Sequence, residues 1–315
     1  MNGQKKAVVA LGGNAITREF EEGNIYQQFA NTRNSLRGVV DLIENGYKIV
    51  ITHGNGPQVG NYLIRVEETR NLVPPVPLGV IVADLMGGMG YMIEQSLQNK
   101  LHLRGINRKV VTIPAQVIVD KDDPSILNPT KFVGPFYSED QVEMLSKERS
   151  YIMKYDAGRG YLRVVPSPLP KKIVEKDVIK MLFNNDVIVI TAGGGGAPVY
   201  IEKDGTYEGV DAVVDKDRTA AILAQDIDAN ELYILTGVSK VSLNYKKPNQ
   251  IDLDELHIED AKKYLQEGQF PAGSMGPKIE AAIEFLSHGG EQVIISSVDN
   301  MPAAIKGETG TRILP

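Results

Sequence analysis

The sequence contains no cysteine. That absence excludes disulfide bonds, thiol nucleophiles and cysteine-ligated metals, and it is typical of an intracellular protein. The sequence also lacks an excess of positive charge, because its formal net charge at pH 7 is −6. Such a balance argues against broad binding to nucleic acid or to anionic membranes. The expected partners are therefore small molecules.

Long hydrophobic runs are missing as well. The apolar stretch 7–11, which follows Lys5 and Lys6, is too short for the core of a secretion signal, and no other run approaches the length of a membrane span. We therefore expect a cytoplasmic protein without a membrane partner. Its 315 residues, 42% hydrophobic and 23% charged, are ordinary for a globular chain.

Apolar runs that alternate with helical stripes predict the fold class. Strands are predicted at 6–11, 47–52, 109–119 with a break at Pro114, 187–191, 232–235 and, as the last strand, 292–296. Apolar residues at i, i+3, i+4 and i+7 predict helices around 36–43, 59–66, 220–227 and 279–286. The glycines at 87–90 are expected to interrupt two helices. This alternation predicts a single domain, 1–315, with a three-layer α/β/α sandwich and a mainly parallel central sheet.

The regular pattern fails between residues 120 and 170. This segment is rich in aspartate, proline and glycine and leaves through Pro166-Ser167-Pro168. We interpret it as an insertion between core elements that forms a lid subdomain. The alternative is an insertion that has only a structural role.

Glycine-rich turns follow several of the predicted strands. Gly12-Gly13-Asn14, His53-Gly54-Asn55-Gly56 and the four glycines 193–196 all stand where ligands bind in open α/β sheets. Four glycines at one strand end predict close approach of a ligand to the backbone. Gly54, Gly56 and Gly60 resemble a dinucleotide fingerprint, but a proline-rich loop at 74–77 stands where that motif needs a strand ending in an acidic residue. A dehydrogenase is therefore rejected.

Two lysines stand at predicted helix starts, where a positive charge is unfavourable. Lys278 falls in the first turn behind Pro277, and Lys216 stands just before a helix for which Asp217 is the expected N-cap. A helix N-terminus favours anions, so these lysines predict a site that holds phosphate oxygens. A solvated surface lysine is the alternative for Lys278. No Walker A or protein-kinase signature is present, so the phosphate contacts would come from several strand ends.

This combination of glycine turns and separate lysines resembles the amino acid kinase family, in particular its members that act on carbamate. The stretches that carry the resemblance are 8–15 (VVALGGNA), 52–60 (THGNGPQVG), 128–131 (NPTK), 164–168 (VVPSP), 193–199 (GGGGAPV), 214–217 (VDKD) and 273–278 (GSMGPK). One stretch departs from the family, since Met86-Gly87 stands where a glutamine followed by glycine is usual. That departure puts contacts from this part of the chain in doubt.

The resemblance implies phosphoryl transfer between ATP and carbamate to give ADP and carbamoyl phosphate, with the direction toward ATP synthesis expected in the cell. It implies catalytic roles for Lys131, Lys216, Asp217 and Lys278. It implies substrate or phosphate contacts from Gly12, Gly13, Asn14, His53, Gly54, Asn55 and Gly56, and nucleotide contacts from Gly194, Gly195, Thr236, Gly237, Tyr245, Met275 and Gly276. Carbamate oxygen is already anionic, so no general base is required.

The same resemblance implies Mg2+ with ATP or ADP, bound through phosphate oxygens and water rather than by dedicated protein ligands. It also implies a homodimer. Two alternatives stay open. Another member of the family would phosphorylate a different acceptor, such as isopentenyl phosphate or an amino-acid carboxylate, and should lack the Asn128 to Lys131 motif. A non-catalytic nucleotide sensor should have lost at least one of the three lysines.

Overall fold

A central sheet organises the molecule. The computed structural model describes residues 4–18, 21–156 and 160–315. The sheet has eight strands in the order β15-β17-β16-β12-β1-β2-β9-β3, and every neighbouring pair except β16 and β17 runs parallel. The strands are β1 Lys6–Leu11, β2 Lys48–His53, β3 Val110–Ile113, β9 Ile188–Thr191, β12 Glu231–Thr236, β15 Glu255–His257, β16 Gln292–Ser297 and β17 Thr311–Leu314. The predicted mainly parallel sheet is confirmed.

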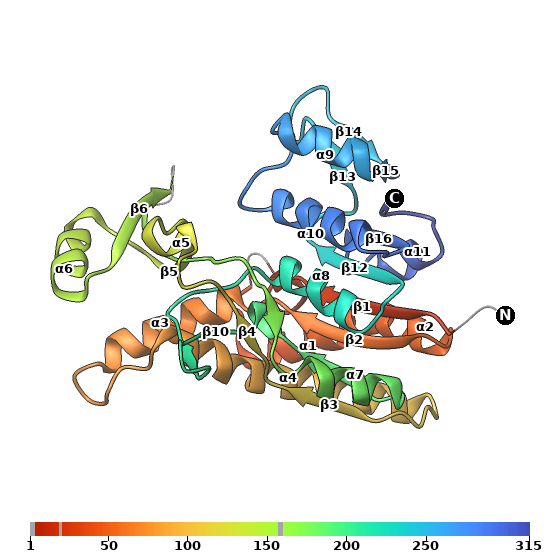
Figure 1. Ribbon diagram of the computed structural model, residues 1–315, viewed down its shortest axis with the longest axis horizontal. Helices are drawn as coiled ribbons and strands as arrows, with labels where there is room; N and C mark the ends of the chain where they lie inside the picture. The colour runs from red at the N-terminus through yellow and green to blue at the C-terminus, as the bar shows by residue number, and fades with distance from the viewer. Residues whose placement is uncertain (1–3, 19–20, 157–159) are drawn as a thin grey trace.

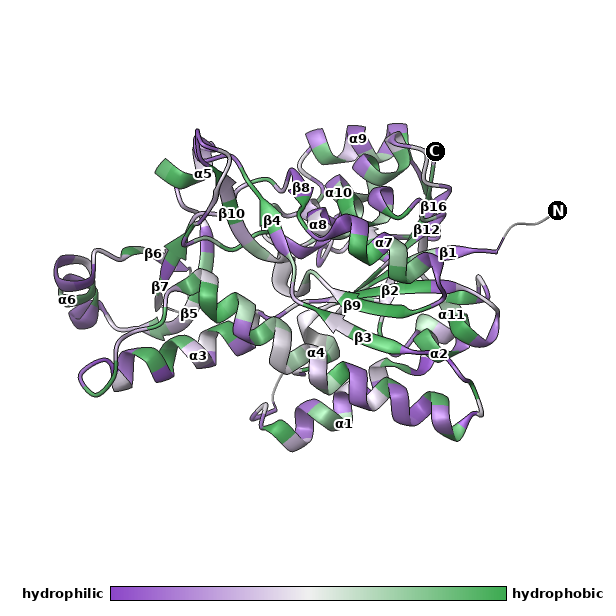
Figure 2. Ribbon diagram, turned by 60° about the horizontal axis from the view of Figure 1, so that its bottom comes forward, coloured by the Kyte–Doolittle hydropathy of each residue, from purple (hydrophilic) through white to green (hydrophobic). Residues whose placement is uncertain are grey.

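Helices cover both faces of this sheet, which explains why its strands are apolar throughout. In β1, Val8 and Ala10 enter one core, whereas Val9 and Leu11 enter the other. The first core is covered by α7 Lys176–Asn184, α8 Lys216–Asp226, α9 Ile258–Gln266 and α10 Met275–Ser287. The second is covered by α1 Ile25–Ser35, α2 Arg37–Glu44, α4 Leu78–Leu103 and α11 Met301–Ile305. Figure 2 shows the hydrophobic strands enclosed between the helices, so the three-layer sandwich is confirmed.

Smaller sheets surround this core. A four-stranded sheet contains β4 Gln116–Ile118, β8 Lys172–Ile173, β10 Ala197–Ile201 and β11 Tyr207–Gly209, and a hairpin pairs β13 Val241–Leu243 with β14 Ile251–Leu253. Two short 3-10 helices, η1 Gly13–Ala15 and η2 Gly193–Gly195, follow β1 and β9. Helix α3, Gly56–Thr69, follows β2.

The segment 120–170 has regular structure of its own. It contains α5 Pro124–Leu127, β5 Lys131–Tyr137, α6 Glu139–Arg149, β6 Ile152–Asp156 and β7 Gly160–Val165, with the strands in an antiparallel sheet ordered β5-β7-β6. This sheet and α6 project from one side of the molecule near the end of α3 (Figure 1). The segment leaves and rejoins the body through β4 and β8, which pair antiparallel with Ile118 opposite Lys172. Both of its ends are therefore anchored at one place.

Two expectations about the elements are wrong. The glycines 87–90 lie inside one helix of 26 residues, α4, and do not interrupt it. Met86, Met89 and Met92 are buried around them, and this packing outweighs the cost of about 1 kcal/mol per glycine. The last strand is β17 rather than 292–296, because Thr311–Leu314 pairs with both β16 and β15. Only Thr311 and Ile313 of that strand are buried, so its sequence pattern is weak. Among the described helices, α4 included, none is both long enough and apolar enough to cross a membrane.

Candidate active site

The glycine turns gather at one edge of the central sheet. Strands β1, β2, β9 and β12 are parallel, so the residues that follow them meet at the carboxyl edge. A Cβ atom added to Gly54, after β2, would lie 3.0 Å from the backbone nitrogen of Gly13, after β1. A Cβ at Gly12 would lie 2.5 Å from the carbonyl oxygen of Leu235, at the end of β12. These turns require glycine because three chain segments approach one another closely.

Asp217 joins two of the predicted lysines. Lys216 Nζ donates to Asp217 Oδ1 at 2.5 Å, and Lys278 Nζ donates to Asp217 Oδ2 at 3.0 Å. Asp217 is buried, with 3% of the residue exposed. Burial alone would raise its pKa, but the positive charges of Lys216 and Lys278 outweigh burial and hold the pKa at about 2. Asp217 therefore stays ionised at neutral pH and fixes one lysine of α8 beside one of α10.

The N-cap of α8 is Asp215, not Asp217 as expected. Asp215 Oδ1 accepts hydrogen bonds from the backbone nitrogens of Asp217 and Arg218 at 3.0 and 3.4 Å, and Lys216 is the first residue of the helix. The other oxygen, Oδ2, accepts from Lys131 Nζ at 3.2 Å. Asp215 was not among the predicted site residues, although an aspartate before a helical stripe is a good N-cap signal.

These charged residues line one cavity of about 210 Å³. Its wall contains the four residues assigned to catalysis together with Gly54, Asn55, Gly56 and Gly194. Val59, Phe132, Val133, Val213, Val214, Asp215, Gly273, Ser274 and Pro277 complete it. Asn55 is buried, and its side-chain nitrogen Nδ2 has no hydrogen-bond partner among the described residues. The hydrogen-bonding capacity of this amide nitrogen is therefore left unused by the described residues around it.

Two helices begin at this cavity without a side-chain cap. Helix α3 starts at Gly56 after Asn55, and α10 starts at Met275 after Ser274. Asn55, Gly56 and Ser274 all line the cavity. The positive ends of the two helix dipoles therefore add to the charge of the lysines. The site is built to hold an anion with several oxygens.

A second cavity of about 350 Å³ adjoins the first. Ser274 and Lys278 line both. Four residues predicted to bind nucleotide are in its wall, namely Thr236, Gly237, Tyr245 and Met275. Val238, Lys240, Ser242, Gln269, Phe270 and Pro271 complete it and were not predicted. The loops around β13 and the segment before α10 carry no motif of their own, so nothing in the sequence pointed to these six.

Several predicted contact residues lie outside both walls. Gly12 and Gly13 pack behind Gly54, and the side chain of Asn14 lies outside the described part of the chain. Gly276 is buried in the first turn of α10, where a Cβ would lie 3.1 Å from the carbonyl oxygen of Pro271. Gly12, Gly13 and Gly276 therefore shape the backbone that carries the cavity rather than its surface.

The sequence predicted that a ligand approaches the four glycines after β9, but most of them are required because other parts of the protein pack against them. Gly194 lines the first cavity, but a Cβ at Gly193 would lie 2.2 Å from His53 Nε2 and one at Gly195 would lie 2.3 Å from the carbonyl oxygen of Val214. A Cβ at Gly196 would lie 2.3 Å from Val117 Cγ2. Close approach of protein atoms, together with positive φ angles at Gly194, Gly195 and Gly196, therefore accounts for most of this run.

His53 is buried beneath this glycine turn and does not belong to the cavity wall. Its Nδ1 lies 3.2 Å from the carbonyl oxygen of Gly54, so Nδ1 carries the proton of the neutral ring. Burial lowers the pKa of His53 to about 4; the hydrogen bond to Gly54 opposes that shift, and the charge of Lys216 adds to it. The ring supports the turn that bears Gly54 and Asn55.

Comparisons with known proteins agree with this geometry. The model of the amino acid kinase family matches residues 5–297. The chain is 46% identical to the carbamate kinase of Pyrococcus furiosus over 99% of both chains, and 47% identical to the carbamate kinase-like protein YahI of Escherichia coli over 98% of both. A solved structure of carbamate kinase from Giardia lamblia bound to AMP-PNP superimposes with a TM-score of 0.93 at 40% identity, covering 100% of this chain and 99% of that one. The chain belongs to the amino acid kinase family.

Proposed function

We propose that this protein is a carbamate kinase, which transfers a phosphoryl group reversibly between ATP and carbamate. The observation that carries the proposal is the first cavity, where Lys131, Lys216 and Lys278 meet beside uncapped helix starts at the carboxyl edge of the sheet. Full-length similarity to proteins named carbamate kinase supports the choice of acceptor. In the cell we propose that the reaction runs toward ATP.

We assign the nucleotide to the second cavity. Its walls mix apolar and aromatic side chains such as Val238, Phe270 and Met275 with polar groups such as Thr236 and Ser242, which suits a base and a ribose. Lys278 lies between the two cavities, so the terminal phosphate of a nucleotide bound there would reach the first cavity. The structure of a relative bound to AMP-PNP supports the binding of a nucleotide.

Carbamate is assigned to the first cavity. Its anionic oxygen attacks the γ-phosphorus of ATP, the bond from that phosphorus to the bridging oxygen breaks, and the electron pair stays on ADP. The amino group keeps both of its protons, so no proton has to leave during transfer. The protein's task is to hold two anions together and to stabilise the charge on the transferring group. Lys216 and Lys278, fixed by Asp217, and the backbone at Asn55 and Gly56 are placed for that task.

Mg2+ fits this site only as a companion of the nucleotide. Within 4–18, 21–156 and 160–315, no group of three or more acidic or histidine side chains is placed to hold a metal ion. The carboxylates of Asp215 and Asp217 already accept hydrogen bonds on both oxygens. When bound through phosphate oxygens and water, Mg2+ would neutralise part of the nucleotide's charge.

We also propose that the segment 120–170 closes over the acceptor. Both of its ends leave from the paired strands β4 and β8, and Lys131 at the start of β5 lines the first cavity. Its outer part rests on α3, where Glu67 accepts a hydrogen bond from Tyr151 and pairs with Arg149 at 3.7 Å. Closure would exclude water, which otherwise weakens each lysine's field and can hydrolyse the product.

Hydrogen exchange tests the lid. Backbone amides of 131–156 should exchange faster than those of β1 and β2 without ligands, and should become protected when ADP and a carbamoyl phosphate analogue bind together. ADP alone should give much less protection, because the acceptor side stays empty. Equal exchange in all three states would remove the lid from the proposal.

We propose a homodimer that uses one face of α4. Val80, Gly87 and Tyr91 lie at i, i+7 and i+11 on this helix and are exposed. A Cβ at Gly87 meets nothing within 4 Å, so another backbone could approach closely there.

Sedimentation tests the homodimer and should give twice the mass of one chain. Gly87→Glu should give the single mass, whereas Gly209→Glu, also in open space, should not change it. A monomeric parent protein would contradict the proposal.

The choice of acceptor is tested in the direction that consumes ATP. Purified protein with Mg2+ and ATP should form ADP when carbamate, supplied from ammonia and bicarbonate, is present. Isopentenyl phosphate and N-acetylglutamate should give no more ADP than an acceptor-free control. Good turnover with one of these and none with carbamate would leave the family assignment intact and show the acceptor to be wrong.

A further inference from the structure

Asp215 makes two contacts that no part of the proposed chemistry explains. One of its oxygens caps α8, and the other accepts from Lys131 Nζ at 3.2 Å. Its side chain is 13% exposed and lines the first cavity. A carboxylate at a cavity meant for anionic oxygens repels them unless its charge is offset. Here the start of α8 and Lys131 offset that charge.

The contact joins two units of the chain. Lys131 is the first residue of β5 in the segment 120–170, whereas Asp215 belongs to the body. A backbone hydrogen bond of 3.0 Å from Val213 to Pro166 lies nearby and ties the same two units. The lysine side chain is 39% exposed, so without Asp215 its long stem would be free to leave the cavity for solvent.

Resting on the proposed function, we infer that Asp215 is a positioning residue, which holds Lys131 of the segment 120–170 at the cavity wall so that its ammonium group meets the transferring phosphoryl group. Asp215 touches no reacting atom in this role. It acts through Lys131. Because Asp215 also caps α8, it holds Lys131 beside Lys216 and Asp217 at the start of that helix. The gain is preorganisation, because Lys131 loses its side-chain freedom before substrate arrives.

Asparagine at 215 separates the two contacts. Asn and Asp cap helices about equally well, so Asp215→Asn keeps the cap and removes the charge pair. Asp215→Ala removes both. We expect Asp215→Asn to lower kcat with carbamoyl phosphate about 5- to 10-fold, with KM for ADP within about twofold, a scale consistent with a partly exposed pair that orients one group. The unfolding midpoint should fall for Asp215→Ala and stay nearly unchanged for Asp215→Asn.

A double-mutant cycle tests whether Asp215 acts through Lys131. In a Lys131→Met background, Asp215→Asn should change kcat less than about twofold, because its partner is already gone. If Asp215→Asn lowers kcat equally in both backgrounds, or raises it in the parent, the inference is wrong. It is also wrong if Asp215→Asn raises the Mg2+ concentration needed for half-maximal rate more than about tenfold, since Asp215 would then serve the metal.

A measurement without turnover keeps this inference separate from the proposed function. In ligand-free protein, the backbone amides of 131–137 should exchange faster in Asp215→Asn and in Lys131→Met than in the parent, and no faster still in the double variant. Amides of α7 serve as the control and should not change. A parent that forms no ATP from carbamoyl phosphate would contradict the function alone. Unchanged exchange at 131–137 in Asp215→Asn would overturn the inference whatever the activity.

Discussion

At the scale of residues, the site depends on one buried carboxylate. Asp217 draws Lys216 and Lys278 together from two helices, and the pair of lysines holds its pKa at about 2. Without the carboxylate of Asp217, the ammonium groups of Lys216 and Lys278 would repel each other. The arrangement therefore concentrates positive charge where an anion can offset it, and holds that charge ready before substrate arrives.

Replacing either lysine by methionine keeps the stem and removes the charge. We expect Lys216→Met and Lys278→Met each to lower kcat roughly 10²- to 10³-fold, the usual scale for one preorganised electrostatic donor. Asp217 would still pair with its other lysine. We therefore expect the free energy of unfolding to fall by less than the roughly 3–5 kcal/mol that is usual when a buried charge loses its partner. The measurement is steady-state ATP formation with saturating ADP.

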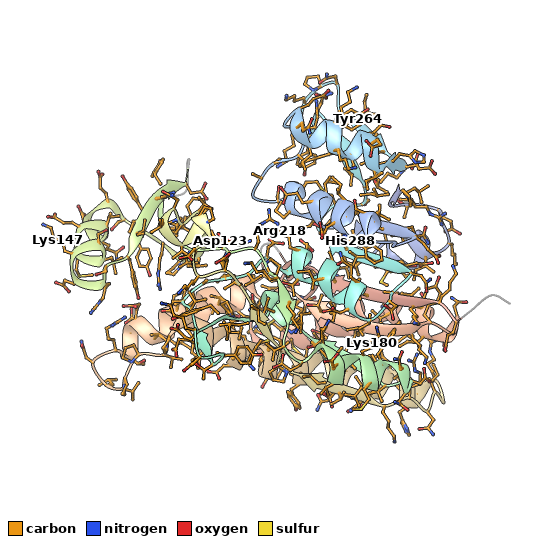
Figure 3. All side chains as sticks on the ribbon, in the orientation of Figure 1. Asp123, Lys147, Lys180, Arg218, Tyr264 and His288 are labelled. Atoms are coloured by element: carbon orange, nitrogen blue, oxygen red, sulfur yellow. The ribbon has the colours of Figure 1, made fainter. Side chains whose placement is uncertain are left out.

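Lys180→Met is the matched control for those variants. Lys180 lies on α7 (Figure 3), pairs with Asp228 at 2.7 Å and is not among the residues that line either cavity. Its replacement should leave kcat unchanged. A Lys278→Met protein that turns over like the control would return Lys278 to the role of a solvated surface lysine.

His53 makes stability depend on pH. Burial lowers its pKa to about 4 in the folded state, whereas in the unfolded chain the imidazole has its ordinary pKa of 6.5. Between these values the unfolded state binds more protons, so stability falls as the pH drops from 6.5 toward 4, by on the order of 2–3 kcal/mol in total. Above pH 6.5 the ring is neutral in both states and the effect vanishes.

His53→Gln should therefore flatten the pH dependence of the unfolding free energy between pH 6.5 and 5. His102→Gln is the control, because His102 is exposed, and its curve should run parallel to that of the parent protein. Denaturant unfolding at half-unit pH steps measures both. Parallel curves for His53→Gln and the parent would show that the buried ring does not carry this dependence.

At the scale of elements, the glycines of α4 lie in different surroundings, so glycine is not required at each of them for the same reason. A Cβ at Gly90 would lie 2.2 Å from Thr112 Cγ2 on β3, whereas one at Gly87 would face open space. Gly90 is thus a point where a helix approaches the sheet closely. Sequence alone predicted a helix break for the whole run, because the cost of glycine is visible in the sequence and the neighbour that requires it is not.

Gly90→Ala should lower the free energy of unfolding by about 1–3 kcal/mol, the usual cost of overpacking, despite the better helix propensity of alanine. Thr112→Ser removes the methyl group that the new Cβ would strike and keeps the hydroxyl, which donates to Glu94 at 2.7 Å. The double variant should recover part of the loss. No recovery would mean that Thr112 is not the obstacle.

At the scale of the whole molecule, the sequence predicted the sheet and much of the site for one reason. Buried parallel strands are apolar on both faces, and glycine turns mark their carboxyl ends, so β1, β2, β9, β12 and the cavity edge could be placed. Contacts between distant segments could not. The cap and ion pair of Asp215, the six further residues of the second cavity, and the burial of His53 depend on neighbours that only the fold brings together.

The two adjoining cavities fit the reaction that we propose, in which a nucleotide in one would exchange a phosphoryl group with carbamate in the other beside Lys278. The most direct test is to mix purified protein with ADP, Mg2+ and carbamoyl phosphate and to measure ATP over time against an enzyme-free control. We predict that ATP forms until carbamoyl phosphate or ADP is consumed, and that Lys278→Met loses this activity while Lys180→Met keeps it. Failure to form ATP above the control, in protein that still binds ADP, would contradict the assignment.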